Sequence, residues 1–306
     1  MSLAVQFSEY GSTDLLSVVD VPLPSAGPGQ VRLAVRAAGI NPVDWKILLG
    51  YLREQIPLEF PAGLGSDVAG VVDQVGEGVT AFSIGDEVLG TALTPAYAQS
   101  ALADPGALVA RPTAVPWEVA GSLAGAGGTA WAVINRLKVA DGETLLIHAA
   151  SGGVGTFAVQ LAVARGARVI GTASERNHEL LRSLGAEPVT YGEGLADRVR
   201  AIAPRGVDAV LDASGRGEIP ASIELAGGPE RVLTLVAFDA AATGIQIHGG
   251  GAGDSGTRPL QDILALIDDG RLRVPISRTY PLQEAAAALD ASHDGHVSGK
   301  SVLLPA

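Results

Sequence analysis

A glycine-rich stretch near the middle of the chain carries the clearest chemical signal. In Thr144–Gly155, TLLIHAASGGVG, a short apolar run is followed by small residues, and helical apolar periodicity then continues through Ala164. A strand, a tight turn and a helix in this order can bind an anion, because the first turn of a helix has unpaired N–H groups and a partial positive charge. Ala150, Gly152 and Gly155 occupy the small positions of the G-x-G-x-x-G pattern, with Ala replacing the first Gly. We therefore expect this turn to bind the pyrophosphate of a dinucleotide through Ser151, Gly152, Gly153 and Val154.

The end of the next predicted strand, Ala167–Thr172, indicates which dinucleotide binds. Enzymes that prefer NAD place an acid there, about 20 residues beyond the turn, to bind the ribose 2′-hydroxyl. This chain has Ser174 instead, whose hydroxyl can donate to a 2′-phosphate, and Arg176 can add a charged, forked donor. Glu175 lies between them and would disfavour NADPH if it pointed inward. The pattern favours NADPH over NADH.

The composition excludes several other classes of function. The 306 residues allow about two domains, and the formal net charge of −12 argues against general nucleic-acid binding. The chain has no cysteine, which excludes disulfides, thiolate zinc sites and cysteine nucleophiles. No apolar run reaches the roughly 18 residues that span a bilayer, and the N-terminus lacks the pattern of a signal peptide. We expect no membrane partner and a cytoplasmic location.

Residues 1–116 are predicted to form a distorted β-barrel, because short apolar runs alternate with turns. Within this region, Pro42–Leu49 has the pattern of a short helix with proline in its first turn. The expected strands are Leu3–Phe7, Leu15–Val21, Val31–Ala38, Val68–Val75, Glu87–Leu89 and Ala107–Ala110.

Residues 117–270 are predicted to form a doubly wound parallel sheet, because strands and helices alternate at βαβ spacing. Residues 271–306 again have the short extended runs of residues 1–116, and we expect them to complete the first domain. The expected fold class is therefore α/β with two domains. The expected helices are Trp117–Ala120, Thr129–Leu137, His178–Leu184, Leu195–Ile202, Pro259–Asp269 and Gln283–Ser292. Besides the strands of the glycine turn, we expect Pro188–Tyr191, Val207–Ala213, Arg231–Ala237, Ile245–His248, Arg271–Tyr280 and Lys300–Leu304 to be extended and Gly249–Gly256 to be a loop.

Several longer motifs, in order, make the chain similar to a known family. They are AGINPVDWKI (Ala38–Ile47), PAGLGSDVAGVV (Pro61–Val72), GVTAFSIGDEV (Gly78–Val88), HAASGGVG (His148–Gly155), SLGAEPVTY (Ser183–Tyr191), LIDDGRLRVPISRTYPL (Leu266–Leu282) and GHVSGKSVLL (Gly295–Leu304). With these motifs the chain resembles the quinone oxidoreductase branch of the medium-chain dehydrogenase/reductase superfamily. The resemblance implies a GroES-like domain, an NADPH-binding Rossmann domain and a substrate cleft between them.

The chain differs from the zinc-dependent enzymes of the same superfamily at the positions of their metal ligands. It has Asn41-Pro42-Val43-Asp44 where they place a cysteine, and Gly65-Ser66-Asp67 where they carry Gly-His-Glu. The loop with four cysteines for a structural zinc is absent. We therefore predict chemistry without a metal.

The resemblance also assigns three residues to the cofactor site. Asn41 matches a polar residue at the nicotinamide end, although an Asn before Pro also favours a turn. Thr129 matches a helix beside the cofactor, and its alternative role is a helix-start hydroxyl. Tyr191 matches a position that lines the 2′-phosphate pocket.

Three further residues are expected near the cofactor. Ser214 and Phe238 follow predicted strands at the carboxyl edge of the sheet, where ligands of such sheets bind, although Phe238 could equally belong to the core. Lys300, in the GKSVLL motif, is expected to reach the adenosine phosphate or to be a solvated lysine at the start of a strand.

The chemistry implied is transfer of hydride from NADPH to a small quinone or α,β-unsaturated carbonyl. Asp44, Lys46, Tyr51 and Asp67 are polar candidates, but none is singled out as the proton donor, so the catalytic residue is unknown; Lys46 stands where relatives often have tyrosine. The alternatives are an enoyl-thioester reductase and a non-catalytic NADPH-binding protein. Ile245–His248 is the expected edge strand of a homodimer, unless the chain itself covers that edge.

Overall fold

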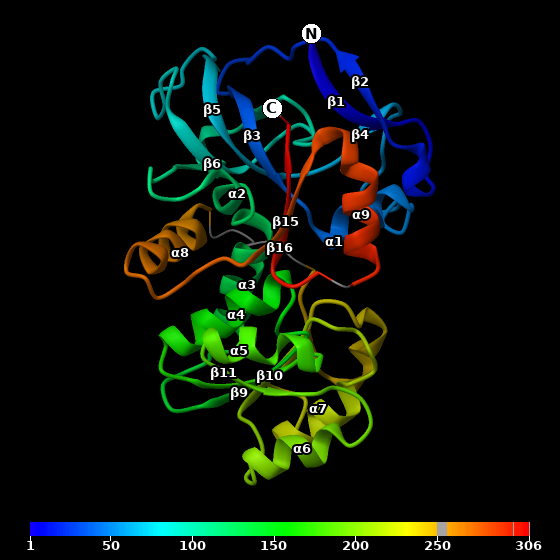
Figure 1. Ribbon diagram of the computed structural model, residues 1–306, viewed down its shortest axis with the longest axis vertical. Coiled ribbons are helices and arrows are strands. Elements are labelled where there is room, and N and C mark those ends of the chain that lie inside the picture. The colour runs from blue at the N-terminus through cyan, green and yellow to red at the C-terminus, as the bar shows by residue number, and fades with distance from the viewer. Residues whose placement is uncertain (250–255, 296, 306) are drawn as a thin grey trace. The chain divides into compact units, whose positions relative to one another are not determined.

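The computed structural model describes residues 1–249, 256–295 and 297–305 (Figure 1). The chain divides into two compact units: unit 1 comprises Met1–Gly125, Ser255–Gln261 and Ile276–Ala306, and unit 2 comprises Ala126–Asp254 and Asp262–Pro275. The domain boundaries expected after residues 116 and 270 differ from these unit boundaries by several residues and stay a prediction. Of the glycine-rich loop expected over Gly249–Gly256, residues 250–255 lie outside the described residues.

Unit 1 is built from two sheets of short strands. A three-stranded sheet has the order β2-β1-β4, and a larger sheet has the order β15-β16-β3-β5-β6-β8, with β7 paired to β3. The strands are β1 (Ser2–Phe7), β2 (Ser17–Val21), β3 (Val31–Gly39), β4 (Ala62–Gly63), β5 (Asp67–Val75), β6 (Glu87–Thr91), β7 (Ser100–Ala103), β8 (Leu108–Ala110), β15 (Ile276–Pro281) and β16 (Lys300–Leu304). Near the C-terminus, β16 pairs with β3 in the larger sheet.

Some boundaries in unit 1 were predicted wrongly. Leu15 and Ala107 end the short 3₁₀ helices η1 (Thr13–Leu15) and η2 (Pro105–Ala107) instead of starting strands, and the strand expected from Arg271 starts at Ile276. Strands β4 and β7 were not predicted, because both are short and lack a clear alternation of apolar and polar residues.

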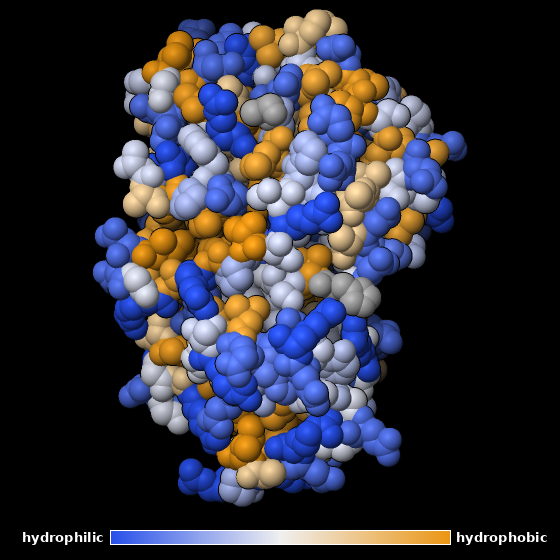
Figure 2. All heavy atoms as spheres, viewed as in Figure 1, coloured by the Kyte–Doolittle hydropathy of each residue, from blue (hydrophilic) through white to orange (hydrophobic). Residues whose placement is uncertain are grey.

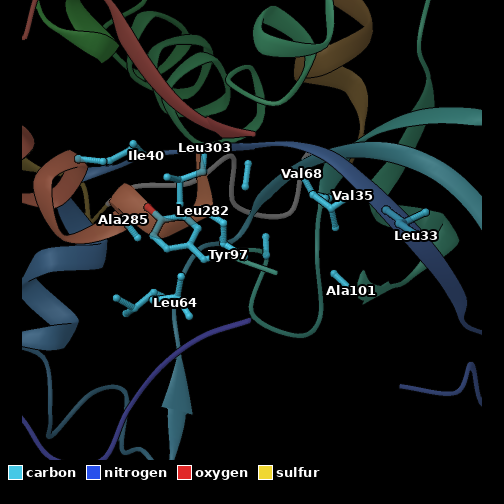
Figure 3. Packing of buried hydrophobic residues seen from close by; sticks show 14 of the residues in the cluster. Leu33, Val35, Ile40, Leu64, Val68, Tyr97, Ala101, Leu282, Ala285 and Leu303 are labelled. Carbon is cyan, nitrogen blue, oxygen red and sulfur yellow. The ribbon is translucent and has the colours of Figure 1, made fainter. Parts of the chain in front are cut away.

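The core of unit 1 follows from the two-residue period of its strands. In β3, Val31, Leu33 and Val35 are buried, while the residues between them are more exposed. Figure 3 shows Leu33 and Val35 on this strand, with Tyr97 packed in the same cluster near Leu64 and Leu282. Three helices accompany the sheets: α1 (Pro42–Leu48), α2 (Trp117–Ala120) and α9 (Ala285–His293), with the 3₁₀ helix η6 (Leu282–Glu284) before α9.

Unit 2 contains a six-stranded sheet in which every neighbouring pair is parallel. Its order is β11-β10-β9-β12-β13-β14, the 3-2-1-4-5-6 order of a dinucleotide-binding doubly wound sheet, which confirms the prediction. The strands are β9 (Thr144–His148), β10 (Arg168–Thr172), β11 (Ala186–Val189), β12 (Ala209–Asp212), β13 (Val232–Thr234) and β14 (Gln246–Ile247).

The helices of the second half differ from expectation at two places. Helix α3 (Ala124–Arg136) starts five residues before Thr129, because its first turns are made of glycine and alanine, which carry no apolar periodicity. Helix α7 (Ile219–Ala226) was not predicted at all. The other helices are α4 (Gly153–Ala164), α5 (His178–Ser183), α6 (Leu195–Ile202) and α8 (Arg258–Asp268), with 3₁₀ helices η3 (Glu175–Asn177) and η4 (Phe238–Thr243).

Figure 2 shows hydrophilic residues interspersed with hydrophobic ones over the visible face. Among the described residues, no helix is both long enough and apolar enough to cross a membrane.

Candidate functional site

The glycine-rich turn connects the carboxyl end of β9 to helix α4 through a strained residue. Ala149 has a φ of 54°, in the left-handed region that costs a residue with a Cβ about 1–2 kcal/mol. Two contacts with Thr172 hold this conformation: the Ala149 N–H donates to Thr172 Oγ1 (3.2 Å) and the Ala150 N–H donates to the Thr172 carbonyl (3.0 Å). Strain that the surroundings enforce in this way is typical of a ligand-binding turn.

The turn leaves the start of helix α4 able to receive an anion. Gly152 is the N-cap residue, and no side chain caps the helix there, so the orphan N–H groups of the first turn remain for a ligand. Gly155 lies against the turn itself: a Cβ there would be 2.4 Å from the Ala149 carbonyl oxygen and 2.7 Å from Ala150 Cα. The small residues therefore fit a pyrophosphate cradle, with Gly155 serving the close approach of helix to turn.

The buried side chain of His148 contacts Thr172, the residue that holds the turn. Ser222 Oγ donates to the Glu218 carbonyl (2.7 Å), so the contact between Ser222 Oγ and His148 Nε2 (2.9 Å) assigns the hydrogen to Nε2. His148 Nδ1 is then an acceptor, 3.5 Å from Thr172 Oγ1, the same oxygen that receives the Ala149 N–H. Burial lowers the pKa of His148, which keeps the imidazole neutral and this direction of hydrogen bonds intact.

The other predicted cofactor residues of unit 2 follow the carboxyl ends of neighbouring strands. Ser174 follows β10, Tyr191 follows β11, Ser214 follows β12 and Phe238 follows β13, so all four lie toward the same edge of the sheet as the glycine turn. Strand order reverses between β9 and β12, next to the glycine turn, at the position where ligands of such sheets bind.

The expected 2′-phosphate region contains both charge types. Ser174 is the N-cap of η3, and Glu175 and Arg176 are both exposed in that 3₁₀ helix. Tyr191 is also exposed, and the guanidinium of Arg216 lies 5.2 Å from its ring centroid. Arg216 was missed in the sequence because it comes from the loop after β12, and no motif connects it to Tyr191.

Some alternatives for these residues are wrong. Phe238 is 50% exposed, so it is not a core residue. Thr129 is buried in the middle of α3, so it is not a helix-start hydroxyl. The Ser214 hydroxyl lies within hydrogen-bond distance of Asp212 Oδ1 (3.0 Å) and Glu218 Oε2 (2.6 Å) and shares its one hydrogen between them, which fixes the loop after β12. Ser151 Oγ accepts a hydrogen bond from Asn177 Nδ2 (3.0 Å), which orients this turn residue.

Unit 1 contains a buried polar cluster around Asn41, which we call the Asn41 cluster: Asn41, Asp44, Asp67, Tyr97 and Lys300. Lys300 Nζ donates to Asn41 Oδ1 (2.6 Å) and to the Ile40 carbonyl (2.9 Å). Asn41 Nδ2 donates to Asp67 Oδ2 (3.0 Å). The amide thus bridges an ammonium and a carboxylate. Lys300 is 2% exposed, so the expected solvated lysine is wrong; its contact with an adenosine phosphate stays a prediction.

Asp44 and Tyr97 form the other half of the cluster. Asp44 Oδ2 accepts hydrogen bonds from Tyr97 Oη (2.7 Å) and from the Asn41 backbone N–H (2.8 Å), which ties the N-terminus of α1 to the core. Burial raises the pKa of Asp44 to about 6, against the lowering effect of these hydrogen bonds. Burial also raises the pKa of Asp67 and lowers that of Lys300, while the attraction between the opposite charges opposes both shifts.

The remaining polar candidates lie on and after α1. Lys46 is near the Trp45 ring (5.5 Å to the centroid), and partial burial lowers its pKa. Tyr51 is 66% exposed and borders a surface pocket of about 430 Å³ lined by residues 49–51 and 53–55. Over the described residues, no group of three histidine, aspartate or glutamate side chains is arranged to hold a metal ion.

Two family models match the chain. One described as an alcohol dehydrogenase GroES-like domain matches residues 27–139, and one described as a zinc-binding dehydrogenase matches residues 184–303.

Full-length relatives are similar to the chain throughout. The chloroplast envelope quinone oxidoreductase homolog of Arabidopsis thaliana is 32% identical over 99% of this chain and 98% of its own length. A stretch of the polyketide synthase GfsB of Streptomyces halstedii is 34% identical over 90% of this chain, which spans 5% of that synthase.

Solved structures confirm the expected architecture. The quinone oxidoreductase of Coxiella burnetii has a TM-score of 0.90 and 33% identity, with 100% of both chains covered. A mycobacterial protein solved in complex with NADPH has a TM-score of 0.88 and 29% identity, again with 100% of both chains covered. A GroES-like domain combined with a Rossmann sheet is thus the fold that these comparisons support.

Proposed function

Because the chain belongs to the quinone oxidoreductase branch of the medium-chain dehydrogenase/reductase superfamily, we propose that it transfers hydride from NADPH to a small quinone or α,β-unsaturated carbonyl. The observation that carries the proposal is the glycine turn, which keeps the cradle geometry for a pyrophosphate in a chain similar to quinone oxidoreductases over its full length. NADPH supplies the hydride when it is bound, and the protein supplies position and electrostatics.

In unit 2, the residues of the chain bind and orient the cofactor. The N–H groups at the start of α4 receive the pyrophosphate, with Ser151, Gly152, Gly153 and Val154 forming the turn. Ser174, Arg176 and Tyr191 receive the 2′-phosphate, and Arg216 adds a second cation beside Tyr191. This arrangement supports NADPH because the guanidinium groups of Arg176 and Arg216 can each bind a phosphate through paired hydrogen bonds, although the carboxylates of Glu175 and Glu218 lie on the same loops.

In unit 1, we assign Asn41 to the reacting end of the cofactor. Its amide can donate a hydrogen bond to a carbonyl oxygen, either of the nicotinamide carboxamide or of the acceptor. On the acceptor, this oxygen gains negative charge as the hydride arrives, and the hydrogen bond stabilises that charge. The proposal includes no metal, because Asn41 and Asp67, at positions where zinc-dependent relatives carry metal ligands, are hydrogen-bonded to each other and Asn41 also accepts from Lys300. The acceptor's proton can come from solvent.

NADPH oxidation with 1,4-benzoquinone, 9,10-phenanthrenequinone and a small enone, repeated with NADH, tests the proposal. We expect turnover of a quinone with NADPH, and we expect Ser174→Asp/Arg176→Ala to raise the KM for NADPH while leaving the KM for NADH less affected. Turnover that is equal with NADH would contradict the 2′-phosphate assignment. No turnover of any acceptor, with NADPH still bound, would favour the non-catalytic alternative.

A second candidate is reduction of an enoyl thioester. It is favoured by the likeness to a stretch of a polyketide synthase, which extends over 90% of this chain. Crotonyl-coenzyme A is the discriminating substrate: a kcat/KM above that of every quinone would replace the quinone assignment with this one.

We also propose a homodimer that forms along β14. The place of β14 as the last strand of the six-stranded sheet supports this dimer, because among the described residues no further strand pairs with its outer edge. The Arg136 side chain covers part of that strand, since it donates to the Ile247 carbonyl (2.9 Å) and to Gln246 Oε1 (3.0 Å). Light scattering after gel filtration tests the dimer, and Ile247→Lys should shift it toward the monomer. The cytoplasmic location stays a prediction, because the Arabidopsis relative carries a chloroplast envelope name.

A further inference from the structure

The amide of Asn41 is held in one orientation by groups of opposite charge. Lys300 Nζ donates to Oδ1 at 2.6 Å, and Nδ2 donates to Asp67 Oδ2 at 3.0 Å. Rotating the amide by half a turn would place its N–H groups against the ammonium and its oxygen against the carboxylate. Both contacts would then be repulsive, so the observed orientation is strongly preferred.

Each of the two anchors is itself held in place. Lys300 Nζ also donates to the Ile40 carbonyl (2.9 Å), and Asp67 Oδ1 accepts the N–H of Gly125 (2.8 Å), in the first turn of α3. A Cβ on Gly125 would lie 2.9 Å from Asp67 Oδ1 and 3.2 Å from Asn41 Nδ2, so both side chains pack against a position where any larger residue would displace them.

Within the Asn41 cluster, Asn41 is the member that keeps the most contact with solvent. Asn41 is 8% exposed, while Asp67 is 1% and Lys300 is 2% exposed. An amide has two N–H groups and two oxygen lone pairs, and the anchors take one of each. One N–H of Nδ2 therefore remains to donate to a ligand, in a direction set by Asp67 and Lys300.

We infer that Lys300 and Asp67 are positioning residues for the reaction, which act by fixing the amide of Asn41 so that it presents an N–H donor to the reacting carbonyl oxygen. This inference rests on the proposed function. It gives Lys300 and Asp67 a role that differs from the contact with the adenosine phosphate expected for Lys300. It also predicts that the ligand atom facing Asn41 is a hydrogen-bond acceptor.

The first test observes the amide directly. The chain has three asparagines, Asn41, Asn135 and Asn177, so selective ¹⁵N labelling of asparagine gives three side-chain NH₂ pairs. The Asn41 pair is assigned by its loss in Asn41→Ala. We expect Lys300→Met to shift or broaden this pair and leave the other two unchanged. An Asn41 pair that is unaltered by Lys300→Met would overturn the inference.

The second test separates positioning from stability. We expect Lys300→Met to lower kcat for the quinone by about 10- to 100-fold, the effect of misorienting one contact group, with the Kd for NADPH changed less. In the Asn41→Ala background, the same substitution should have no further effect on kcat. An equal loss of kcat with and without Asn41 would show that Lys300 acts by another route.

Two variants keep these tests decisive. If Lys300→Met alone does not fold because Asp67 is left as an unpaired buried charge, Lys300→Met/Asp67→Asn removes both charges and should show the same loss of kcat. The matched control is Arg32→Met, which breaks the ion pair with Asp73 (2.8 Å) between β3 and β5 of the same unit. It should change the melting temperature without changing kcat or the Asn41 amide signals.

Failure of the proposed function gives a different pattern. A wild-type protein that turns over no quinone or enone would refute that function, while the amide spectra would still report whether Lys300 and Asp67 fix Asn41.

Discussion

Replacing Gly155 with alanine tests the cofactor turn most directly, because the structure specifies the collision. The new Cβ would lie 2.4 Å from the carbonyl oxygen of Ala149 and 2.7 Å from the Cα of Ala150. Both neighbours are backbone atoms, so no side chain can rotate away. Ordinary contact begins near 3.4 Å, and the start of α4 must therefore move about 1 Å from the turn.

The expected cost has two parts. Overpacking of this kind costs about 1–3 kcal/mol, which should appear as a lower melting temperature of the free protein. The shift also moves the N–H groups of α4 relative to the turn; losing one charge-assisted hydrogen bond to the pyrophosphate costs about 1.5–3 kcal/mol. By the relation between free energy and affinity, the Kd for NADPH should rise about 10- to 100-fold.

Gly152→Ala is the matched control in the same turn. Its Cβ would be 3.3 Å from the Ala149 carbonyl oxygen, a contact that a shift of a few tenths of an ångström relieves, and its φ of −78° suits alanine. Thermal unfolding compares the stability of both variants, and titration of NADPH fluorescence compares the affinity of Gly155→Ala with that of the wild type. A Gly155→Ala protein with the stability and affinity of the wild type, or one more stable than Gly152→Ala, would refute the packing argument.

Three further substitutions test other parts of the structure. Burial raises the pKa of Asp44 to about 6, so the folded state keeps a proton that the unfolded state releases above its pKa of 3.8. As the pH rises from about 4 to 6.5, the free energy of unfolding of the wild type should therefore fall by about 3 kcal/mol relative to that of Asp44→Asn, measured by urea unfolding. The same pH dependence in both proteins would contradict this. Burial lowers the pKa of His148, so stability should fall as pH drops below 6.5, and urea unfolding of His148→Gln should lack this loss. Lys138 has a φ of 53° just after α3, so Lys138→Gly should raise stability by about 0.5–1 kcal/mol in thermal unfolding, and a lower melting temperature would disprove the strain.

Local patterns were sufficient to predict the sheet of unit 2. Apolar runs such as Thr144–Ile147 fit strands of a parallel sheet that helices cover on both faces, so the strands and the parallel architecture followed from the alternation with helices. The order of the strands was not predicted and comes from the structure. The pattern was insufficient at α7, where Pro220 and the glycines before it read as a loop although proline is well accepted in the first turn of a helix. It was also insufficient at the start of α3, whose glycines serve close packing, as Gly125 does against Asp67.

The candidate site was predictable only where a residue's role is local to its strand or turn. The glycine turn and the residues that follow each strand could be placed from sequence, because parallel topology brings all carboxyl ends to one edge. The supports of that turn were not predictable. His148, Thr172 and Ser222 come from β9, β10 and α7, and their side chains meet only after the sheet has formed.

The Asn41 cluster shows the same limit in its strongest form, and also indicates why these charges are there. Lys300 and Asn41 are separated by 259 positions, and a lysine at the start of an apolar strand has the pattern of a solvated residue. Burying two carboxylates and one ammonium is expensive, and apolar residues of similar volume would often stabilise a fold as well or better. Stability alone therefore does not account for them. Fixing one orientation of the Asn41 amide requires an acceptor on one side and a charged donor on the other, which Asp67 and Lys300 supply and apolar residues cannot.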